Sequence, residues 1–436
     1  MRVLLITPTF PPVSGSHVQR MLKMANCLAD EDVDITVLSA KIDKNHPTFS
    51  FDLVSEINSK IKIIRAPQGF LHRKAYSTFK DESDIHYNKK KTNSSGIKRI
   101  IYNFVQKSKR TILFPDTMVD WVPAVLKFER KNNIVSRLKP DIIVSCSQPS
   151  STHILGYRLS KMYGIPLYMD YADPWTYLDN YNKKSIRFIL NRLIENRIIC
   201  YASGLSFSAP GCMNLYRNKF SLQNSKTVTA MSGIEERLLF KSQEKNTYAR
   251  NNKITFTYGG ALHEYVRNPS PFFSAAKDYE DQLEVDIRTD NIDFAKRLLM
   301  EANNPKCINI LPYISFDEYF DEMLTKDVIL FFGNKNNIQV PGKIFNCLAT
   351  GRFILYIKSN DSRKDTVEEI LRNYKKSIVV SNTASEISRA LKYIIENMDV
   401  VRANWTLDKK LLQYSDREQY KRVAIHLKKI IRSKEK

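Results

Sequence analysis

Several features that would assign this 436-residue chain to a simple class are missing from it. Its six cysteines stand far apart, with no C-x-x-C pair and no Cys/His cluster, so neither a disulfide framework nor a zinc site is expected. No stretch approaches the roughly 18 uninterrupted apolar residues of a membrane-spanning helix. The first apolar run, in "MRVLLITPTFPP", is too short for a signal peptide and predicts a buried strand. The composition therefore predicts a reduced, cytoplasmic protein, free or bound to a membrane surface.

Familiar catalytic motifs are also missing. The chain has no G-x-x-x-x-G-K-[ST], no H-E-x-x-H and no G-x-S-x-G, and its first glycine loop is not a G-x-G-x-x-G dinucleotide fingerprint. Asp32 and Asp34 form a D-x-D, but they precede a predicted strand, which is a poor position for a metal-bound nucleotide. We expect no metal site and no bound cofactor.

Positive charge is abundant, with a formal net charge of +22. This charge favours anionic partners such as nucleic acid, an acidic bilayer or a phosphorylated substrate. A stretch without acids, "KKKTNSSGIKRIIYNFVQKSKR", runs from Lys89 to Arg110 and has isoleucines at helical spacing. It predicts a basic amphipathic helix suited to an anionic membrane surface. A solvated charged face above an ordinary core stripe is the alternative.

Short apolar runs alternate with helical patterns along the chain, which predicts parallel sheets. The fold class expected is α/β, with two Rossmann-like, doubly wound domains facing a cleft. We place the first domain at 1–235, with a basic insertion at about 70–115, and the second at 236–410. A linker is expected in "EERLLFKSQEKNTYARNNK". A last helix within 411–436 is expected to return to the first domain.

Ligands of open α/β sheets bind at the carboxyl ends of the strands, so the loops after strands are the places to search. The first loop, "TPTFPPVSGSHVQR", contains Gly15 and Ser16, whose backbone amides can approach an anion or a sugar hydroxyl. A plain turn with Ser16 as the helix N-cap is the alternative. In the second domain, Gly259 and Gly260 permit close backbone approach, and Arg267 can clamp a phosphate.

The stretch "VPGKIFNCLATG" holds the third candidate loop. It sets Gly342 and Lys343 at the start of a short helix, with Asn346 on the same face as Lys343. A cation one turn from an amide suits a phosphate beside a sugar hydroxyl. The residues expected on the buried side are Ile344, Phe345, Leu348 and Ala349.

One strand of the first domain ends in "MDYADPW". Asp170 and Asp173 can orient a hydroxyl or act as a general base, and Trp175 can offer a flat apolar surface to a sugar ring. Asp173 before a proline is also an ordinary turn former.

Taken in order, these loops resemble the glycosyltransferases of GT-B fold, particularly family 4, whose retaining enzymes build bacterial surface polysaccharides. "RVLLITPTFPPVSGSHVQR" looks like the opening strand and glycine loop of that family, and "MDYADPW" is similar to its D-x-R-D-P-W segment. "ITFTYGGALHEYVRNPSPFF" resembles the first unit of its donor domain. "VPGKIFNCLATGRFIL" matches the pattern P-x-K-x-F-E-x-L-A-x-G-x-P-I-L.

The resemblance implies a metal-independent transfer of a sugar from a nucleotide-diphosphate sugar to a lipid-linked oligosaccharide, at the inner face of the membrane. It implies catalytic roles for Asp170 and Asp173. The acceptor-binding residues that it implies are His17, Arg20 and Trp175. The donor-binding residues are Gly15, Ser16, Gly259, Gly260, Arg267, Gly342, Lys343 and Asn346.

Three positions depart from the family pattern. Asn346 and Ile338 stand where many members carry glutamates, and Ala172 stands where the family has arginine. An inactive member is therefore one alternative. A sugar-nucleotide epimerase of the same fold is a second, and a basic protein that binds nucleic acid is a third, although no nucleic-acid partner is expected.

Overall fold

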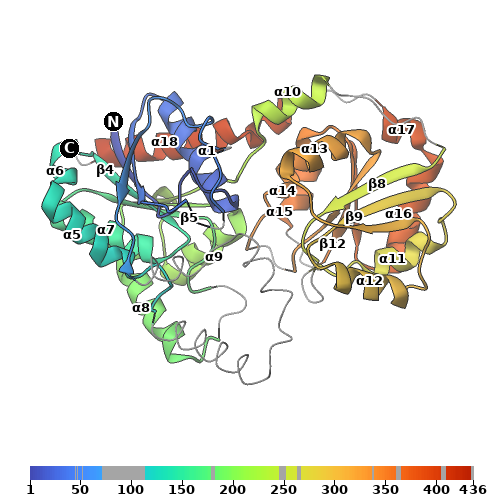
Figure 1. The fold of residues 1–436 in the computed structure, drawn as a ribbon, viewed down its shortest axis with the longest axis horizontal. Helices are drawn as coiled ribbons and strands as arrows, with labels where there is room; N and C mark the ends of the chain where they lie inside the picture. Colours follow the sequence, from blue (N-terminus) through green and yellow to red (C-terminus); the bar gives the residue numbers. More distant parts are fainter. Residues whose placement is uncertain are drawn as a thin grey trace. The chain divides into compact units, whose positions relative to one another are not determined.

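The computed structural model describes residues 1–436 except 45, 47, 52, 71–112, 178–181, 245–251, 263–266, 336–337, 360–364, 404–408 and 434–436. The chain divides into two compact units (Figure 1). The first contains Met1–Ser208, Cys212–Ala230 and Tyr420–Lys436, and the second contains Ala209–Gly211 and Met231–Gln419. The basic stretch from Lys89 to Arg110 lies outside the described residues. Among the described helices, none is long and apolar enough to cross a membrane.

A seven-stranded parallel sheet forms the centre of the first unit, in the order β3-β2-β1-β4-β5-β6-β7. Its strands are β1 Arg2–Ile6, β2 Asp34–Ala40, β3 Lys62–Ala66, β4 Ile142–Ser147, β5 Leu167–Tyr171, β6 Gly204–Phe207 and β7 Thr227–Thr229. β1, β4 and β5 are buried over most or all of their length, which explains why most of their residues are apolar on both faces of the sheet.

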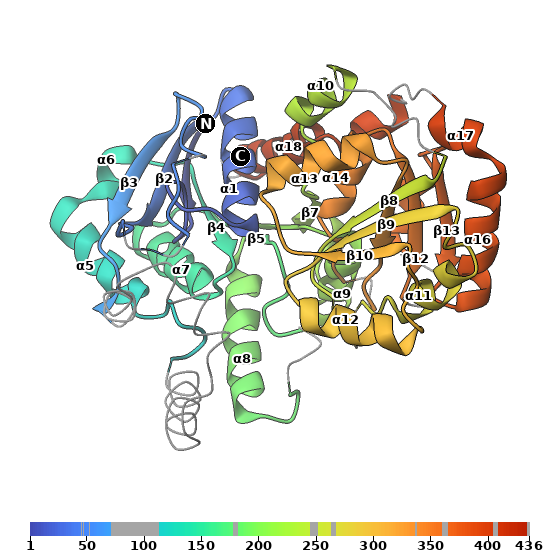
Figure 2. The same ribbon diagram turned by 45° about the vertical axis from the view of Figure 1, so that its right-hand side comes forward.

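Helices cover both faces of this sheet (Figures 1 and 2). α1 and α18 pack with Val3 and Val144 on one face, and α7 packs on the other face of β4, where Ser145 contacts His153. The helices of the unit are α1 Ser16–Asp30, α5 Trp121–Asn132, α6 Ile134–Leu138, α7 Ser151–Tyr163, α8 Ile186–Tyr201, α9 Pro210–Phe220 and α18 Asp416–Arg432, with a 3-10 turn at Asn224–Lys226.

The C-terminal helix returns to the first unit, as expected. Tyr420, Val423, Ala424 and Leu427 of α18 are buried in the same core cluster as α1 and β1. These residues recur every three or four positions, so one face of α18 completes the first core.

A six-stranded parallel sheet forms the centre of the second unit, in the order β10-β9-β8-β11-β12-β13. Its strands are β8 Ile254–Gly259, β9 Leu283–Arg288, β10 Ile308–Leu311, β11 Val328–Phe332, β12 Phe353–Lys358 and β13 Ser377–Ser381. Alternate side chains of β11 enter two separate cores: Leu330 joins one, and Ile329 and Phe331 join the other. The sheet is therefore covered on both sides, which confirms the doubly wound fold.

The helices of the second unit are α10 Glu236–Glu244, α11 Ser270–Lys277, α12 Ile292–Glu301, α13 Phe316–Thr325, α14 Lys343–Ala349, α15 Thr366–Leu371, α16 Ala384–Glu396 and α17 Met398–Arg402, with a 3-10 segment at Lys409–Tyr414. The capping box expected at Ser315 is confirmed. The Ser315 Oγ accepts a bond of 3.3 Å from the Glu318 amide, and the Ser315 amide donates to Glu318 Oε2 at 2.9 Å.

The expected linker is wrong over its first half, because Glu236–Glu244 forms helix α10. Only Leu238 and Ser242 of this helix are buried, which is why its composition looks like that of a loop. The helix packs beside α14, and Lys241 pairs with Asp321 at 2.9 Å. Tertiary contacts thus stabilise this helix, which the spacing of its apolar residues did not lead us to predict.

Candidate active site

Polar side chains gather where the strands of the second sheet end. Gly259 and Gly260 close β8, Asp290 follows β9, Tyr313 follows β10 and Asn334 follows β11. Because parallel strands end at the same edge of a sheet, these residues share one region of the unit. We call Tyr258, Gly259, Gly260, Arg267, Asp290, Tyr313, Asn334 and Lys343 the strand-end cluster.

Lys343, the first residue of α14, reaches back to the glycine loop. Its Nζ donates to the Gly259 carbonyl at 2.9 Å and lies 3.4 Å from the Tyr313 Oη, 5.9 Å from the centroid of that ring. Loss of hydration and the charge of Arg267 lower the pKa of the Lys343 ammonium, and the charge of Asp290 opposes this shift. Two residues 84 positions apart, Gly259 and Lys343, therefore meet as part of one site.

Arg267 supplies a second cation. Its Nε and Nη2 both donate to the Asn334 Oδ1, at 3.2 and 2.9 Å, which fixes the plane of the guanidinium. The guanidinium also bonds to the hydroxyl of Tyr258, although burial raises the pKa of Tyr258 to about 12 overall. Arg267 is close enough to Lys343 to lower its pKa. Two neighbouring cations are an arrangement that a bound anion stabilises.

Gly259 and Gly260 are needed in this loop because a side chain at either position would collide with a neighbouring side chain. A Cβ on Gly259 would lie 2.4 Å from the Tyr319 ring, and a Cβ on Gly260 would lie 2.6 Å from the Tyr258 Oη and 3.2 Å from Lys343 Nζ. A larger residue at Gly259 would displace Tyr319, and one at Gly260 would displace Tyr258 of the cluster. The loop therefore keeps its backbone close to the Lys343 ammonium.

Helix α14 has the faces expected from the sequence. Ile344, Phe345, Leu348 and Ala349 are buried, whereas Lys343 is exposed and Asn346 is half-buried. Gly342 precedes the helix with φ of −56°, so helical geometry alone does not require glycine there, and a Cβ would lie 3.3 Å from Ser232 Oγ. Asn346 lies one turn beyond Lys343.

In the first unit, the structure joins two of the expected site residues directly. Arg20 Nη2 and Nε contact the two Asp170 oxygens at 2.9 and 3.3 Å, and Ser206 Oγ donates to Asp170 Oδ1 at 2.7 Å. Arg20 is 5% exposed and Asp170 is 0% exposed. This burial corrects the expectation that Arg20 contacts an acceptor and Asp170 contacts a substrate, because each presents almost no surface. They form a buried ion pair that positions the elements around it.

Trp175 is also buried, at 4% exposure. Its Nε1 donates to Asn191 Oδ1 at 2.8 Å, and its amide donates to the Tyr216 hydroxyl at 2.8 Å. The ring is part of the core rather than an open platform for a sugar, which corrects the expected acceptor contact. Asp173, two residues earlier, is only half-buried and is the more accessible of the two candidate carboxylates.

The first glycine loop leads directly into α1. Gly15 has φ of 137°, a conformation that side chains disfavour, and it occupies the N-cap position that the alternative assigned to Ser16. His17 is half-buried, with Nε2 3.4 Å from Thr7 Oγ1, and its Nδ1 is buried without a hydrogen-bond partner among the described residues. Burial lowers the pKa of His17 to about 4, so the imidazole is neutral at pH 7.

Tyr258, Asp290, Tyr313 and Asn334 were not expected in the site. Each lies at or just after the end of a strand, which is the signal that could have identified them. Among the described residues, no three His, Cys, Asp or Glu side chains come together as potential metal ligands.

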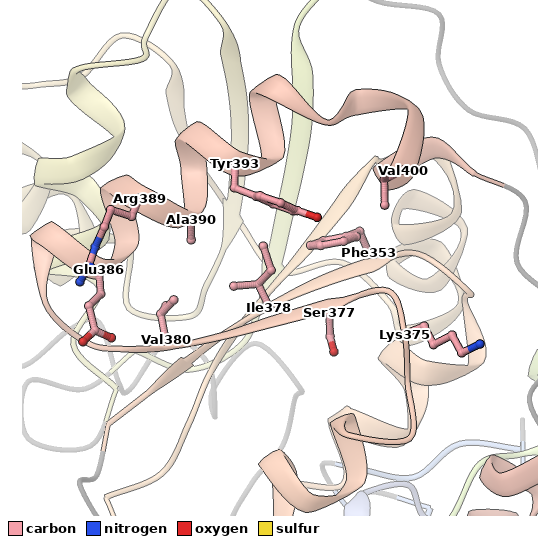
Figure 3. A pocket seen from close by; sticks show the side chains of 10 residues that line it. All are labelled: Phe353, Lys375, Ser377, Ile378, Val380, Glu386, Arg389, Ala390, Tyr393 and Val400. Carbon is pink, nitrogen blue, oxygen red and sulfur yellow. The ribbon is translucent and has the colours of Figure 1, made fainter.

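A separate hollow lies at the β13 edge of the second sheet, where Tyr393 of α16 faces Phe353 and Ile378 across an open groove of about 450 Å³ (Figure 3). None of its lining residues belongs to the strand-end cluster. It therefore stays outside the candidate site.

Comparison with solved structures reveals the fold of the whole chain. Sucrose-phosphate synthase from Thermosynechococcus elongatus matches with a TM-score of 0.62 at 12% identity, covering 99% of this chain and 98% of that one. HepE from Anabaena, solved in complex with UDP-glucose, matches with a TM-score of 0.56 at 10% identity, with 99% and 98% covered. A putative UDP-N-acetylglucosamine 2-epimerase from Listeria monocytogenes matches with a TM-score of 0.54 at 11% identity, with 99% and 97% covered.

The chain therefore has the GT-B fold, with two Rossmann-like α/β domains. No protein-family model matches the sequence, and no curated protein matches it. At these identities the likeness establishes the fold alone.

Proposed function

We propose that this protein is a glycosyltransferase that moves a sugar from a nucleotide-diphosphate sugar to a growing oligosaccharide. The observation that carries the proposal is the presence of two cations in the strand-end cluster: Arg267, which bonds Asn334, and Lys343, which bonds the Gly259 carbonyl and whose pKa the charge of Arg267 lowers. The shared fold with HepE, which was solved with UDP-glucose, adds support.

In the proposed donor complex, the diphosphate lies against the Gly259–Gly260 loop, between Arg267 and Lys343. The bond from the anomeric carbon to the diphosphate oxygen breaks, a bond to the acceptor hydroxyl oxygen forms, and the hydroxyl proton passes to the proposed general base, Asp173. Negative charge develops on the departing diphosphate, where both cations stabilise it without a metal. Asn346, one turn from Lys343, bonds the ribose hydroxyls in place of the family's glutamate. The proposed stereochemical outcome is retention.

We assign the acceptor to the first unit. Asp173 is the proposed catalytic carboxylate, since it is accessible, and the neutral His17 can hydrogen-bond an acceptor hydroxyl. Asp170 and Arg20 act as positioning residues. Gly15 and Ser16 supply the exposed start of α1 for a sugar or phosphate group.

A lipid-linked acceptor at the inner face of the membrane, in cell-envelope polysaccharide biosynthesis, is the proposed context. The net charge of +22 supports it, because the cytoplasmic leaflet is anionic.

The test is a donor panel of UDP, GDP and other nucleotide sugars, with and without a lipid-diphosphate sugar acceptor, in EDTA and in Mg²⁺. We expect acceptor-dependent nucleotide release with one donor, undiminished by EDTA and abolished by Lys343→Ala. Lys296→Ala, an exposed lysine on α12, is the matched control and should behave as wild type. Absence of release with every donor would contradict the proposal.

An epimerase is the second candidate, because the Listeria structure matches over 99% of this chain. It predicts interconversion of a nucleotide sugar without any acceptor. Analysis of the sugar product by NMR in the same panel distinguishes the two reactions.

A further inference from the structure

Helix α8 of the first unit, Ile186–Tyr201, carries large apolar residues on two opposite faces. Its inner face buries Phe188, Ile198 and Ile199, together with the polar Asn191 and Glu195. Its outer face exposes four large apolar residues: Ile186 at 77%, Ile189 at 51%, Leu190 at 46% and Leu193 at 62%. Their spacing of three, four and seven residues makes one continuous stripe along the helix. We call these four residues the α8 stripe.

Such a stripe is unusual for a helix at the surface of a globular protein. Surface helices normally carry polar residues opposite their buried face, and helices that are apolar all round are normally covered. Isolated exposed apolar residues need no explanation, but a contiguous group of four indicates a partner. α8 lies at the edge of the first unit along its length (Figure 2).

Basic side chains lie near the α8 stripe. Lys183, Lys184, Arg192 and Arg197 are exposed. The one acid of α8, Glu195, is fully buried on the inner face, where it accepts bonds from Tyr171 and Tyr216. The described outer surface of this helix is thus apolar along its centre and positive around it.

Tyrosines lie at the C-terminal end of α8, beyond the stripe. Tyr201 packs edge-on against Tyr157 of the neighbouring helix α7, with ring centroids 5.0 Å apart. Arg197 Nε donates to the Tyr157 hydroxyl at 3.2 Å, and Lys161 lies 5.9 Å from the same ring. Amphipathic rings beside cations are typical of the boundary between lipid head groups and acyl chains.

We propose that the α8 stripe is a docking surface for an anionic lipid bilayer, with the helix lying in the interface. The four apolar side chains enter the acyl boundary, and the surrounding cations contact the lipid phosphates. A second copy of the chain fits less well, since a two-fold contact along α8 would bring the same cations of both copies together. The α8 stripe contains none of the residues of the 89–110 stretch. It rests on the membrane location proposed above, but not on the transfer reaction.

The test is flotation with vesicles of phosphatidylcholine alone and of phosphatidylcholine with phosphatidylglycerol. The stripe variant combines Ile186→Gln, Ile189→Gln, Leu190→Gln and Leu193→Gln, which retain good helix formers at exposed positions. We expect wild type to bind the anionic vesicles and the stripe variant to bind about tenfold more weakly or less. The charge variant, with Lys183, Lys184, Arg192 and Arg197 all changed to Gln, should lose the preference for phosphatidylglycerol.

A matched control carries Phe240→Gln, Met300→Gln, Leu412→Gln and Ile425→Gln, four exposed apolar residues elsewhere in the chain. It should bind vesicles as wild type does. Circular dichroism and nucleotide binding, unchanged in the stripe variant, show that a loss of flotation is not a loss of folding or of the donor site.

Three results would overturn the proposal. One is a wild-type protein that does not float, and another is a stripe variant that floats equally well, which would assign the membrane contact to another segment such as residues 71–112. The third is a wild-type dimer that the stripe variant dissociates in analytical ultracentrifugation, because the stripe would then be a self-association surface.

Discussion

At the residue scale, the geometry of Arg267 depends on Asn334. Two N–H groups of the guanidinium share one amide oxygen, so the orientation of the cation is set by a neutral side chain from the neighbouring strand end. Asn334 has no charge of its own to offer a diphosphate. Its contribution to donor binding should therefore act through Arg267.

We predict that Asn334→Ala weakens nucleotide-diphosphate binding by about tenfold, the size of one hydrogen bond to a charged group. Arg267→Ala should weaken binding further, and Asn334→Ala should add nothing in the Arg267→Ala background. Calorimetric titration of the four proteins of this double-mutant cycle measures the coupling. Asn309→Ala, which removes a 3.0 Å bond to Asp286 in the same unit, is the control. If the losses of affinity from the two substitutions add in the double variant, Asn334 does not act through Arg267.

At the scale of elements, the Arg20–Asp170 pair joins parts of the chain that are far apart in sequence. Arg20 belongs to α1, Asp170 to β5 and Ser206 to β6, and Arg20 Nη1 also donates to the Ala230 carbonyl at 2.9 Å. Tyr420 of α18 lies over the guanidinium, 5.7 Å from ring centroid to Cζ. One buried pair thus ties together both ends of the first unit.

We predict that Asp170→Asn destabilises the protein by about 3 kcal/mol, because it leaves a buried guanidinium without its counter-ion. The partly exposed pair Arg2–Asp141, at 3.3 Å with side chains 48% and 32% exposed, is the matched control. Asp141→Asn should cost less than about 1 kcal/mol. Urea denaturation of both variants measures the difference, and equal costs would refute a structural role for the buried pair.

At the scale of the whole molecule, pH changes the free energy of unfolding through buried groups whose contributions change in opposite directions. Burial raises the pKa of Glu195 to about 7 from 4.5, although hydroxyl groups of Thr176, Tyr216 and Tyr171 oppose the shift. Between these pH values the folded chain keeps a proton that the unfolded chain has lost. Glu195 therefore lowers the free energy of unfolding as pH rises from 4.5 to about 7.

Two histidines act in the other direction. Burial lowers the pKa of His17 to about 4 and that of His153 to about 3, so both are neutral in the folded chain. The unfolded chain binds these protons below about pH 6.5. Below that pH, protonation of the unfolded chain thus lowers the free energy of unfolding. In the wild type this effect partly cancels the pH dependence that Glu195 produces.

The difference between wild type and Glu195→Gln isolates the carboxyl group. The amide oxygen can accept the bonds from the Tyr171 and Tyr216 hydroxyls, and the amide nitrogen can donate to the Thr176 hydroxyl, which donates to the second carboxylate oxygen in the wild type. The amide does not titrate. We predict that the variant gains stability relative to wild type as pH rises from about 5 to about 7, by up to about 3 kcal/mol, with no further change above. Urea denaturation across this range measures the difference, and a constant difference would show that Glu195 does not titrate there.

Much of the fold was predictable because the sheets are buried and their strands are uninterrupted apolar runs. The meeting of Lys343 with the Gly259 loop was predictable too, because both lie in segments that follow strands of the same sheet. The burial of Asp170 was not, since its partner Arg20 is 150 positions away. Helix α10 was missed because only two of its residues are buried. Sequence patterns report local periodicity, whereas partners that are distant in sequence are set by the tertiary fold.

The central claim is that the strand-end cluster of the second unit binds a nucleotide diphosphate through its two cations. Calorimetric titration of UDP, GDP and the matching free nucleosides into wild type and Lys343→Ala tests this directly. We predict that one diphosphate binds wild type and binds at least about tenfold more weakly to the variant, while its nucleoside binds both proteins equally. A diphosphate that binds both proteins with the same affinity, or no diphosphate binding at all, would contradict the account.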